Sequence, residues 1–120
     1  QLLDQVRLLD KRDLAAASLP HGDQRKLEVA LLMALEPKVY MFDEPTAGMA
    51  HGDVDTIVQL IKRIRTGRTI LMVEHNLSVV EGLCDTITVL TRGRILAEGD
   101  YATVSKNPEV IAAYLGSADA

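Results

Sequence analysis

Two adjacent carboxylates stand where a short apolar run of this sequence ends. The segment from Lys38 to Gly48 reads Lys-Val-Tyr-Met-Phe-Asp-Glu-Pro-Thr-Ala-Gly. Its apolar part, Val39 to Phe42, is predicted to be a strand buried on both faces, and the proline after the acids prevents the strand from continuing. In open α/β sheets ligands bind at the carboxyl ends of strands. Asp43 and Glu44 are therefore placed for a cation and for proton chemistry.

A second apolar run, Arg68 to Val73, also ends in polar residues, with His75 among them. The segment between the two runs has a helical apolar stripe, formed by Val54, Ile57, Val58, Ile61 and Ile64. A strand–helix–strand order predicts a parallel sheet whose strands end at one edge. We therefore expect Asp43, Glu44 and His75 to converge. One carboxylate could hold Mg²⁺, the other could orient an attacking water, and the histidine could donate to a developing phosphoryl charge. A surface acid pair and an ordinary loop histidine are the alternative.

A helix is predicted to begin within Leu19 to Arg25, whose sequence is Leu-Pro-His-Gly-Asp-Gln-Arg, and to stop at Pro37. Its expected apolar stripe consists of Leu27, Ala30, Leu31, Ala34 and Leu35. The free backbone N–H groups at such a helix start favour an anion such as a phosphate. An ordinary helix start is the alternative.

The remaining segments predict short elements around this central part. An N-terminal surface helix is expected with Leu2, Leu3, Val6 and Leu9 on its apolar face, followed by an alanine-rich connection. After the second run we expect a helix that Asn76 can cap, and a third strand over Thr86 to Leu90. A hairpin partner over Ile95 to Ala97, a short helix, and a last helix from Asn107 complete the prediction.

Composition excludes several classes of function. Thirteen basic and seventeen acidic residues give a net charge of −4, and aromatic residues make up 3% of the chain, so we expect no nucleic-acid partner. The single cysteine, Cys84, cannot form an internal disulfide and suits a reducing cytosol. No apolar run reaches the ~18 residues of a membrane span. Because the chain begins with Gln1 inside a predicted helix, we expect it to be a fragment of a larger protein.

In combination, these motifs resemble those of the ABC-type ATPases. The residues Val39 to Thr46 resemble the Walker B motif, Leu19 to Arg25 the signature motif, Ala47 to Ala50 the loop that crosses the dimer interface, and His75 the switch histidine. The tail, through Arg-Gly-Arg-Ile-Leu-Ala-Glu-Gly at 92–99 and Asn-Pro-Glu-Val-Ile-Ala-Ala-Tyr-Leu-Gly at 107–116, resembles the branched-chain amino acid uptake group. The resemblance covers nearly the whole chain.

The resemblance implies a role for each matched residue. Asp43 would help to hold Mg²⁺, Glu44 would polarise the water that attacks the γ-phosphate of ATP, and His75 would contact that phosphate. The signature residues are Pro20, His21, Gly22, Asp23 and Gln24, and among them Gly22 and its neighbours would present backbone N–H groups to the nucleotide bound on a partner subunit, whereas Pro20 has no N–H to offer. The loop that couples the two sites consists of Ala47, Gly48, Met49 and Ala50.

Two features depart from the family pattern. Pro20 stands in place of Ser and Asp23 in place of Gln, so one hydroxyl contact is lost, and a negative charge lies near the triphosphate unless Asp23 faces away. We therefore predict weaker activation at this signature. In addition, no glycine of the chain is followed by lysine, so the motif G-x-x-x-x-G-K-[ST] is absent and is expected upstream. The fragment alone is expected not to hydrolyse ATP.

The sequence thus predicts a partial α/β P-loop NTPase fold of the ABC type. Residues 1–36 would end the helical subdomain with the signature helix, and residues 37–120 would form the C-terminal part of the ATPase core. The resemblance implies MgATP hydrolysis coupled to branched-chain amino acid uptake at the inner face of the cell membrane. The partners it implies are a second ATPase subunit, two permease subunits and, indirectly, a solute-binding protein.

Three other functions remain open at this point. The first is an importer ATPase of the same subfamily for urea or short amides, which these residues cannot separate from an amino acid importer. The second is a non-catalytic partner subunit with a degenerate signature, although the presence of Glu44 and His75 argues against it. The third is a soluble ABC ATPase of DNA repair or translation, which neither a basic patch nor a large insertion supports.

Overall fold

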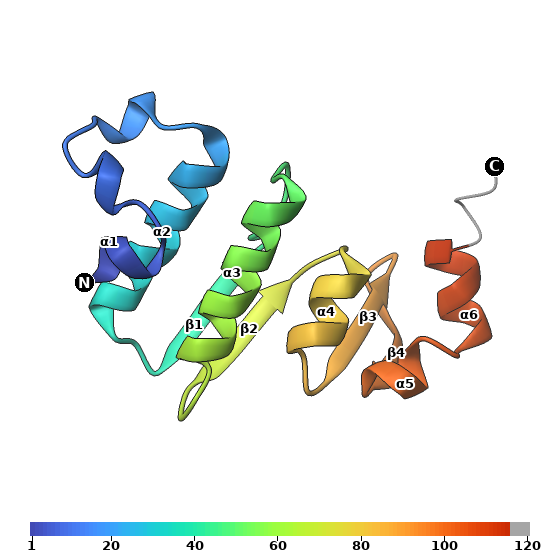
Figure 1. Cartoon of the computed structure of the whole chain (residues 1–120). Helices are drawn as coiled ribbons and strands as arrows, with labels where there is room; N and C mark the ends of the chain where they lie inside the picture. The colour runs from blue at the N-terminus through green and yellow to red at the C-terminus, as the bar shows by residue number, and fades with distance from the viewer. Residues whose placement is uncertain (116–120) are drawn as a thin grey trace. The chain divides into compact units, whose positions relative to one another are not determined.

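The computed structural model describes residues 1–115, with the side chain of residue 115 left aside, and the chain divides into two compact units, Gln1–Asn76 and Leu77–Ala120. Gly116, the last residue of the predicted tail motif, lies outside the described residues. Each unit is described by itself (Figure 1). The predicted subdomain division at residue 36 stays a prediction. No helix within residues 1–115 is both long enough and apolar enough to span a membrane.

The first unit is built on two parallel strands joined by a helix. Strand β1 (Val39–Asp43) pairs with β2 (Thr69–Val73) from Val39 opposite Thr69 to Asp43 opposite Val73, and α3 (His51–Ile64) connects them. Figure 1 shows α3 running along one face of this sheet. The predicted strand–helix–strand order is therefore confirmed, and both strands end at the same edge.

The core of this unit lies between that face of the sheet and α3. Tyr40 and Phe42 of β1 are buried with their rings stacked 6.1 Å apart between centroids. The helix buries Ile57, Leu60, Ile61 and Ile64, close to the predicted stripe. A helix on a sheet face needs such a continuous apolar stripe, and α3 supplies it.

The opposite face of the sheet is uncovered within the described residues. Val39 and Met41 of β1 are exposed, as are Leu71 and Val73 of β2. The prediction that Val39 to Phe42 is buried on both faces is therefore wrong for this chain. Successive side chains of a strand point to opposite faces, so the one helix on this sheet covers only alternate residues.

The N-terminal segment is not the single helix predicted. Helix α1 (Leu2–Gln5) ends early, Arg7 takes a left-handed backbone conformation with φ 58°, and a 3₁₀ turn, η1 (Leu9–Lys11), follows. The turn allows Val6 and Leu8 to be buried together, whereas Leu9 is exposed, contrary to prediction. A second 3₁₀ turn, η2 (Ala16–Ser18), forms the alanine-rich connection.

Helix α2 (His21–Leu35) begins and ends where the sequence predicts, but its buried face differs. Leu31 and Leu35 are 61% and 75% exposed, so the predicted stripe is wrong there. Ala30 is buried as predicted, and the other buried residues of the helix are Asp23, Lys26 and Val29. The helix is rotated relative to the apolar pattern because its two buried charges find partners on the inner side, as shown below.

The second unit contains α4 (Leu77–Leu83) and an antiparallel hairpin. Strand β3 (Ile87–Thr91) pairs with β4 (Arg94–Gly99), so the predicted hairpin is confirmed, although β4 extends two residues beyond the predicted Ala97. The connecting turn places Arg92 and Gly93 at positive φ, 49° and 75°. Two successive left-handed residues match the twist of a tight hairpin.

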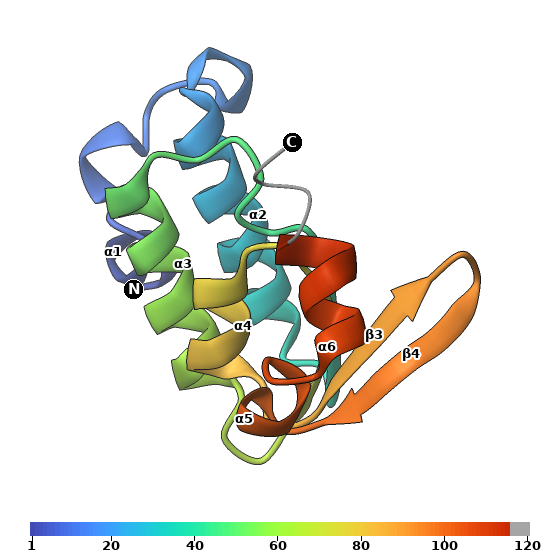
Figure 2. The same cartoon turned by 90° about the vertical axis from the view of Figure 1, so that its right-hand side faces the viewer.

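Short helices close this unit. Asp100 caps α5 (Tyr101–Val104), Asn107 caps α6 (Pro108–Val110), and a π-helical turn, η3 (Ile111–Leu115), follows. Figure 2 shows α5 and α6 beside one side of the hairpin. They bury Val104 and Val110 against Val89 of β3. The two predicted helices at this end of the chain are thus confirmed.

Candidate functional site

The ends of β1 and β2 bring a carboxylate and an imidazole together. His75 Nδ1 lies 3.1 Å from Glu44 Oε1, and the two side chains remain 68% and 47% exposed. Glu44 has a left-handed backbone, with φ 46°, and its N–H donates to the carbonyl of Val73 at 2.8 Å. The predicted convergence of Glu44 and His75 is confirmed. Asp43, exposed at the end of β1, lies opposite Val73 in the register.

Another carboxylate, Glu74, to which the sequence motifs gave no role, connects the loops that follow β1 and β2. Glu74 Oε1 accepts from the Thr46 hydroxyl at 2.6 Å and from the Thr46 N–H at 3.2 Å. Glu74 Oε2 accepts from the N–H groups of His75 and Asn76 at 3.1 and 3.2 Å. The sequence signal that could have indicated a role for Glu74 and Thr46 was their position, an acid directly before the histidine and a threonine directly after the Asp-Glu-Pro run.

The loop after β1 contacts the start of α2 within the same chain. His21 Nε2 lies 3.3 Å from the carbonyl oxygen of Ala47. Gly48 has φ 70°, and a Cβ placed on it would lie 3.6 Å from the same ring nitrogen. The Met49 N–H donates to the Thr46 carbonyl at 3.3 Å, which closes the loop into a turn. The structure therefore brings signature residue His21 to the predicted interface loop, Ala47 to Ala50.

The start of α2 has the backbone groups expected of an anion site. Pro20 is the N-cap and contributes no side-chain hydrogen bond, while its carbonyl accepts from the Gln24 N–H at 3.0 Å. The N–H groups of the first turn after Pro20 have no intrahelical partner. A Cβ at residue 22 would lie 2.5 Å from Asp53 Oδ2, so a side chain there would require the Asp53 carboxylate to move. The use of Gly22 as a backbone donor stays a prediction.

Asp23 does not face this helix start as a free charge. It is 7% exposed and pairs with Lys11 and with Lys26, the latter at 3.1 Å. Lys26 also reaches Asp53 of α3 at 2.5 Å, so the four side chains form one ion-pair network between η1, α2 and α3. Asp23 is therefore buried among its ion-pair partners, and the predicted effect of its charge on nucleotide binding stays a prediction. Its negative charge is compensated locally.

The charges of this network stabilise one another. The hydrogen bond from Lys11, followed by that from Lys26, lowers the pKa of Asp23 below its ordinary value, against the opposing effect of burial. Burial alone lowers the pKa of Lys26, but its hydrogen bonds to Asp53 and Asp23 outweigh that effect, and the pKa is raised. Both groups are therefore charged at neutral pH.

A metal ion would find only part of a site among residues 1–115. No group of three or more histidine, cysteine, aspartate or glutamate side chains is placed there to hold one. Asp43 offers a single carboxylate at the open end of β1. That donor fits Mg²⁺, which commonly binds through one or two carboxylates and takes its other ligands from water and substrate phosphates.

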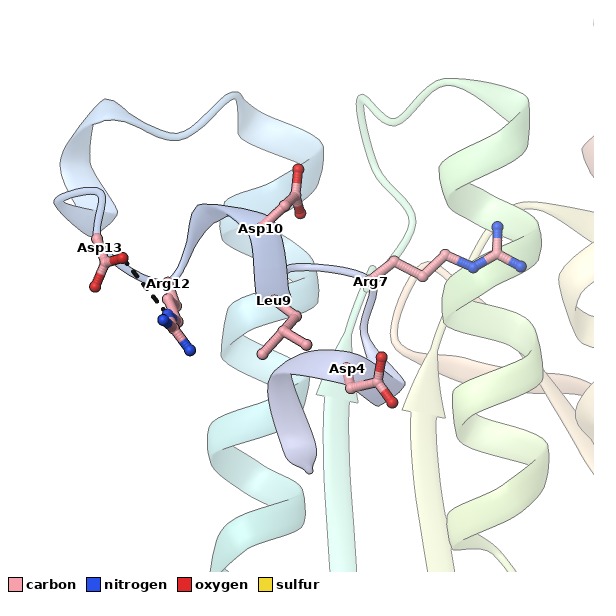
Figure 3. Close-up of a pocket in the computed structure, with 6 residues that line it drawn as sticks. All are labelled: Asp4, Arg7, Leu9, Asp10, Arg12 and Asp13. Carbon is pink, nitrogen blue, oxygen red and sulfur yellow. Dashed lines mark hydrogen bonds and ion pairs between the residues drawn. The ribbon is translucent and has the colours of Figure 1, made fainter.

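An open pocket near the N-terminus does not coincide with these residues. It has a volume of about 670 Å³ and is lined by Asp4, Arg7, Leu9, Asp10, Arg12 and Asp13 (Figure 3). Its charges are of both signs, and Arg12 pairs with Asp13 at 3.5 Å. The lining includes neither the residues at the strand ends nor those at the start of α2. We therefore place the candidate site at the edge of the sheet.

Comparison with known proteins gives a consistent result. Residues 94–120 match the family model described as "Branched-chain amino acid ATP-binding cassette transporter". The chain is 39% identical to the high-affinity branched-chain amino acid transport ATP-binding protein LivG of Escherichia coli (strain K12), and 37% identical to BraF of Pseudomonas aeruginosa, which has the same description. Both alignments cover 97% of this chain and 46% of the relative. The chain thus spans just under half the length of these relatives.

Solved structures show the same similarity. The ADP conformation of MJ1267, an ATP-binding cassette of an ABC transporter, is 30% identical with a TM-score of 0.80, over 96% of this chain and 47% of that one. The protein cbiO1 from Clostridium perfringens, part of the ABC transporter complex cbiONQ, is 27% identical with a TM-score of 0.74, over 98% and 49%. The predicted fold class, a partial ABC ATPase fold, is confirmed.

The first prediction concerns the stability that Asp23 contributes. Asp23→Asn removes the charge that Lys11 and Lys26 share, and we expect it to lower the free energy of unfolding by about 1–3 kcal/mol. Asp13→Asn is the matched control, because its ion pair with Arg12 is exposed and should contribute little. Urea unfolding of the intact subunit that contains this chain measures both. Equal effects of the two variants would contradict the structural role of Asp23.

The second prediction is the pH dependence of that contribution. The pKa of Asp23 is lowered in the folded state. Its stabilisation is therefore present above the unfolded pKa of about 3.9 and is lost as the pH falls through the folded value. The difference in unfolding free energy between wild type and Asp23→Asn should shrink below about pH 4. Urea titrations at pH 7 and at pH 3 test this. A difference that stays constant between them would argue against the ion pairs.

Proposed function

We propose that this chain, which is similar to branched-chain amino acid transport ATP-binding proteins over 97% of its length, belongs to that group of ABC transporters and forms part of an importer ATPase. The complete subunit would couple MgATP hydrolysis to uptake of branched-chain or related amino acids. The observation that carries this proposal is the contact between Glu44 and His75 at the ends of two parallel strands. Sequence alone had suggested that these residues meet, and the geometry supports the same chemistry.

Glu44 is the group we assign to the attacking water. Its carboxylate is about half exposed beyond the sheet edge, and its backbone is fixed by the hydrogen bond to Val73. A carboxylate held in this way can accept a hydrogen bond from water and orient it toward a phosphorus atom. His75 can donate to a phosphate oxygen through its other ring nitrogen, because Nδ1 faces Glu44.

Asp43 is the proposed Mg²⁺ ligand. It lies exposed at the end of β1, directly before Glu44, so that an ion held there would be adjacent to the proposed water. When bound, such an ion supplies positive charge to the phosphates. The phosphate-cradling loop G-x-x-x-x-G-K-[ST] does not occur in these 120 residues. We therefore propose that the chain alone binds MgATP weakly and does not turn it over.

The start of α2 is proposed to serve the nucleotide of a partner subunit. Its free N–H groups and the positive end of the helix dipole favour a phosphate. Two ATPase subunits arranged head to tail would place this helix start against the neighbouring nucleotide, with Ala47 to Ala50 crossing between them. The hydrogen-bond contact of His21 with Ala47 would couple the two parts.

The names of the relatives support a proposed substrate and a set of partners. LivG and BraF are described as branched-chain amino acid transport proteins, whereas MetN of Haemophilus influenzae, a methionine import protein, is 36% identical over 90% of this chain. We propose two permease subunits, an indirect solute-binding protein, and a position at the cytoplasmic face of the membrane. An importer for urea or short amides and a non-catalytic partner subunit remain the alternatives.

The third prediction tests Glu44. In the intact subunit with its permease, Glu44→Gln should lower the ATP turnover number by about 100-fold or more, because the amide cannot accept the proton of the attacking water. Binding of MgATP, measured by equilibrium titration, should be retained. Glu81→Gln, on the exposed side of α4, is the matched control and should leave turnover unchanged. Near-normal turnover in Glu44→Gln would remove Glu44 from its role.

The fourth prediction concerns Pro20. Pro20 is an N-cap without a side-chain acceptor, and it also lacks the hydroxyl found at this position in the family pattern. Pro20→Ser should supply both an N-cap bond and a phosphate contact, and we expect a higher ATPase rate together with a small gain in stability. The analogous change Asp23→Gln is not expected to help, because Asp23 is part of the buried ion network. An unchanged rate in Pro20→Ser would argue against a phosphate contact at residue 20.

A further inference from the structure

We propose that Glu74 is a positioning residue that ties together the two loops after β1 and β2 and thereby holds His75 against Glu44. The inference rests on the proposed ATPase function, since the pair it positions is the proposed catalytic pair. It assigns a role to a carboxylate and to its partner, Thr46, that the sequence motifs left without one.

The bonding of Glu74 is that of a saturated acceptor. Both oxygens are used, one by the side chain and backbone of Thr46 and the other by the backbone of His75 and Asn76. A carboxylate that accepts several N–H and O–H bonds is held in one orientation, because each bond constrains a different direction. Glu74 is partly buried and Thr46 is 6% exposed, so water competes little for the Thr46 hydroxyl.

The position of these bonds in the chain is what makes them relevant to the site. Thr46 follows Glu44 by two residues, and Glu74 directly precedes His75. The parallel ladder ends at the pair Asp43–Val73, so the loops beyond it need other contacts to stay in register. The Thr46–Glu74 bonds connect the two loops beyond the end of the ladder.

The interaction between Glu44 and His75 is too weak to hold these two side chains in one geometry by itself. His75 and Glu44 are largely solvated, and exposed ion pairs contribute little to the free energy that holds two side chains in one geometry. In contrast, the hydrogen bonds that Glu74 accepts come from backbone N–H groups and from the buried hydroxyl of Thr46. The distance between Glu44 and His75 is therefore set by Glu74 and Thr46 rather than by the attraction between the pair.

A near-isosteric change tests the acceptor role. Glu74→Gln keeps the size of the side chain but converts one oxygen into an NH₂ group, which cannot accept from the N–H and O–H donors around it. Thr46→Val removes the hydroxyl and keeps the branched shape, whereas Thr46→Ser keeps the hydroxyl. Glu74→Gln and Thr46→Val should therefore have the same effect, and Thr46→Ser should behave as wild type.

The experiment measures ATPase kinetics of the intact subunit with its permease. We expect the turnover number of Glu74→Gln and of Thr46→Val to fall by about 10- to 100-fold, with KM for MgATP within about twofold, because misplacing a catalytic group affects the chemical step. The double variant, Glu74→Gln with Thr46→Val, should have a turnover number no lower than that of the less active single variant, since both substitutions remove the same connection.

The second unit offers a matched control. Thr88 donates to Glu98 at 2.6 Å, the same length as the Thr46–Glu74 bond, but this exposed pair joins the two strands of the β3–β4 hairpin. Thr88→Val and Glu98→Gln should leave turnover unchanged. A direct readout is amide hydrogen exchange of His75 and Asn76, which should accelerate about 10-fold in Glu74→Gln and stay the same in Glu98→Gln.

The outcomes distinguish this inference from the proposed function. If wild type hydrolyses ATP and Glu44→Gln does not, but Glu74→Gln and Thr46→Val keep normal turnover, the positioning role is overturned and the ATPase function stands. If wild type has no ATPase activity, the proposed function fails first, while the hydrogen exchange still tests the connection. Should Glu74→Gln fail to fold, the contrast between Thr46→Val and Thr46→Ser decides, and equal turnover in these two would overturn the role.

Discussion

The parallel register of β1 and β2 is the constraint on which the described site depends. Because Asp43 lies opposite Val73, the two strands end at the same level of the sheet. Glu44 follows one residue after the end of β1, and His75 follows two residues after the end of β2. A shift of one residue would turn every side chain of one strand to the other face and would separate the carboxylate from the imidazole. The apolar stripe of α3 packs on the face that carries Tyr40 and Phe42, and the other face is exposed among residues 1–115.

A second constraint fixes the start of α2 against α3. The apolar pattern of α2 alone would orient Leu31 and Leu35 inward, yet the helix turns Asp23 and Lys26 inward instead. Burying charges is unfavourable unless they are paired, and here each has two partners of opposite sign. The network thus determines which side of the helix meets α3.

Sequence patterns predicted which helices and strands form better than they predicted which face of each element is buried. The strand–helix–strand unit, the hairpin and the meeting of Glu44 with His75 follow from periodicity and from the rules of parallel sheets. The outward position of Leu31 and the break at Arg7 do not, because both depend on tertiary partners that no local pattern records. The bonds of Glu74 belong to the same class, since Thr46 and Glu74 are 28 positions apart and no local pattern pairs them.

The space between Gly22 and Asp53 has a consequence for how this chain can change. A methyl group at residue 22 would collide with the Asp53 carboxylate, and that carboxylate is one of the two held by Lys26. A larger residue at position 22 therefore requires the Asp53 carboxylate to move, and that movement would act on its ion pair with Lys26. Positions 22, 26 and 53 are therefore coupled, and whether a substitution at one of them is tolerated depends on the residues present at the other two.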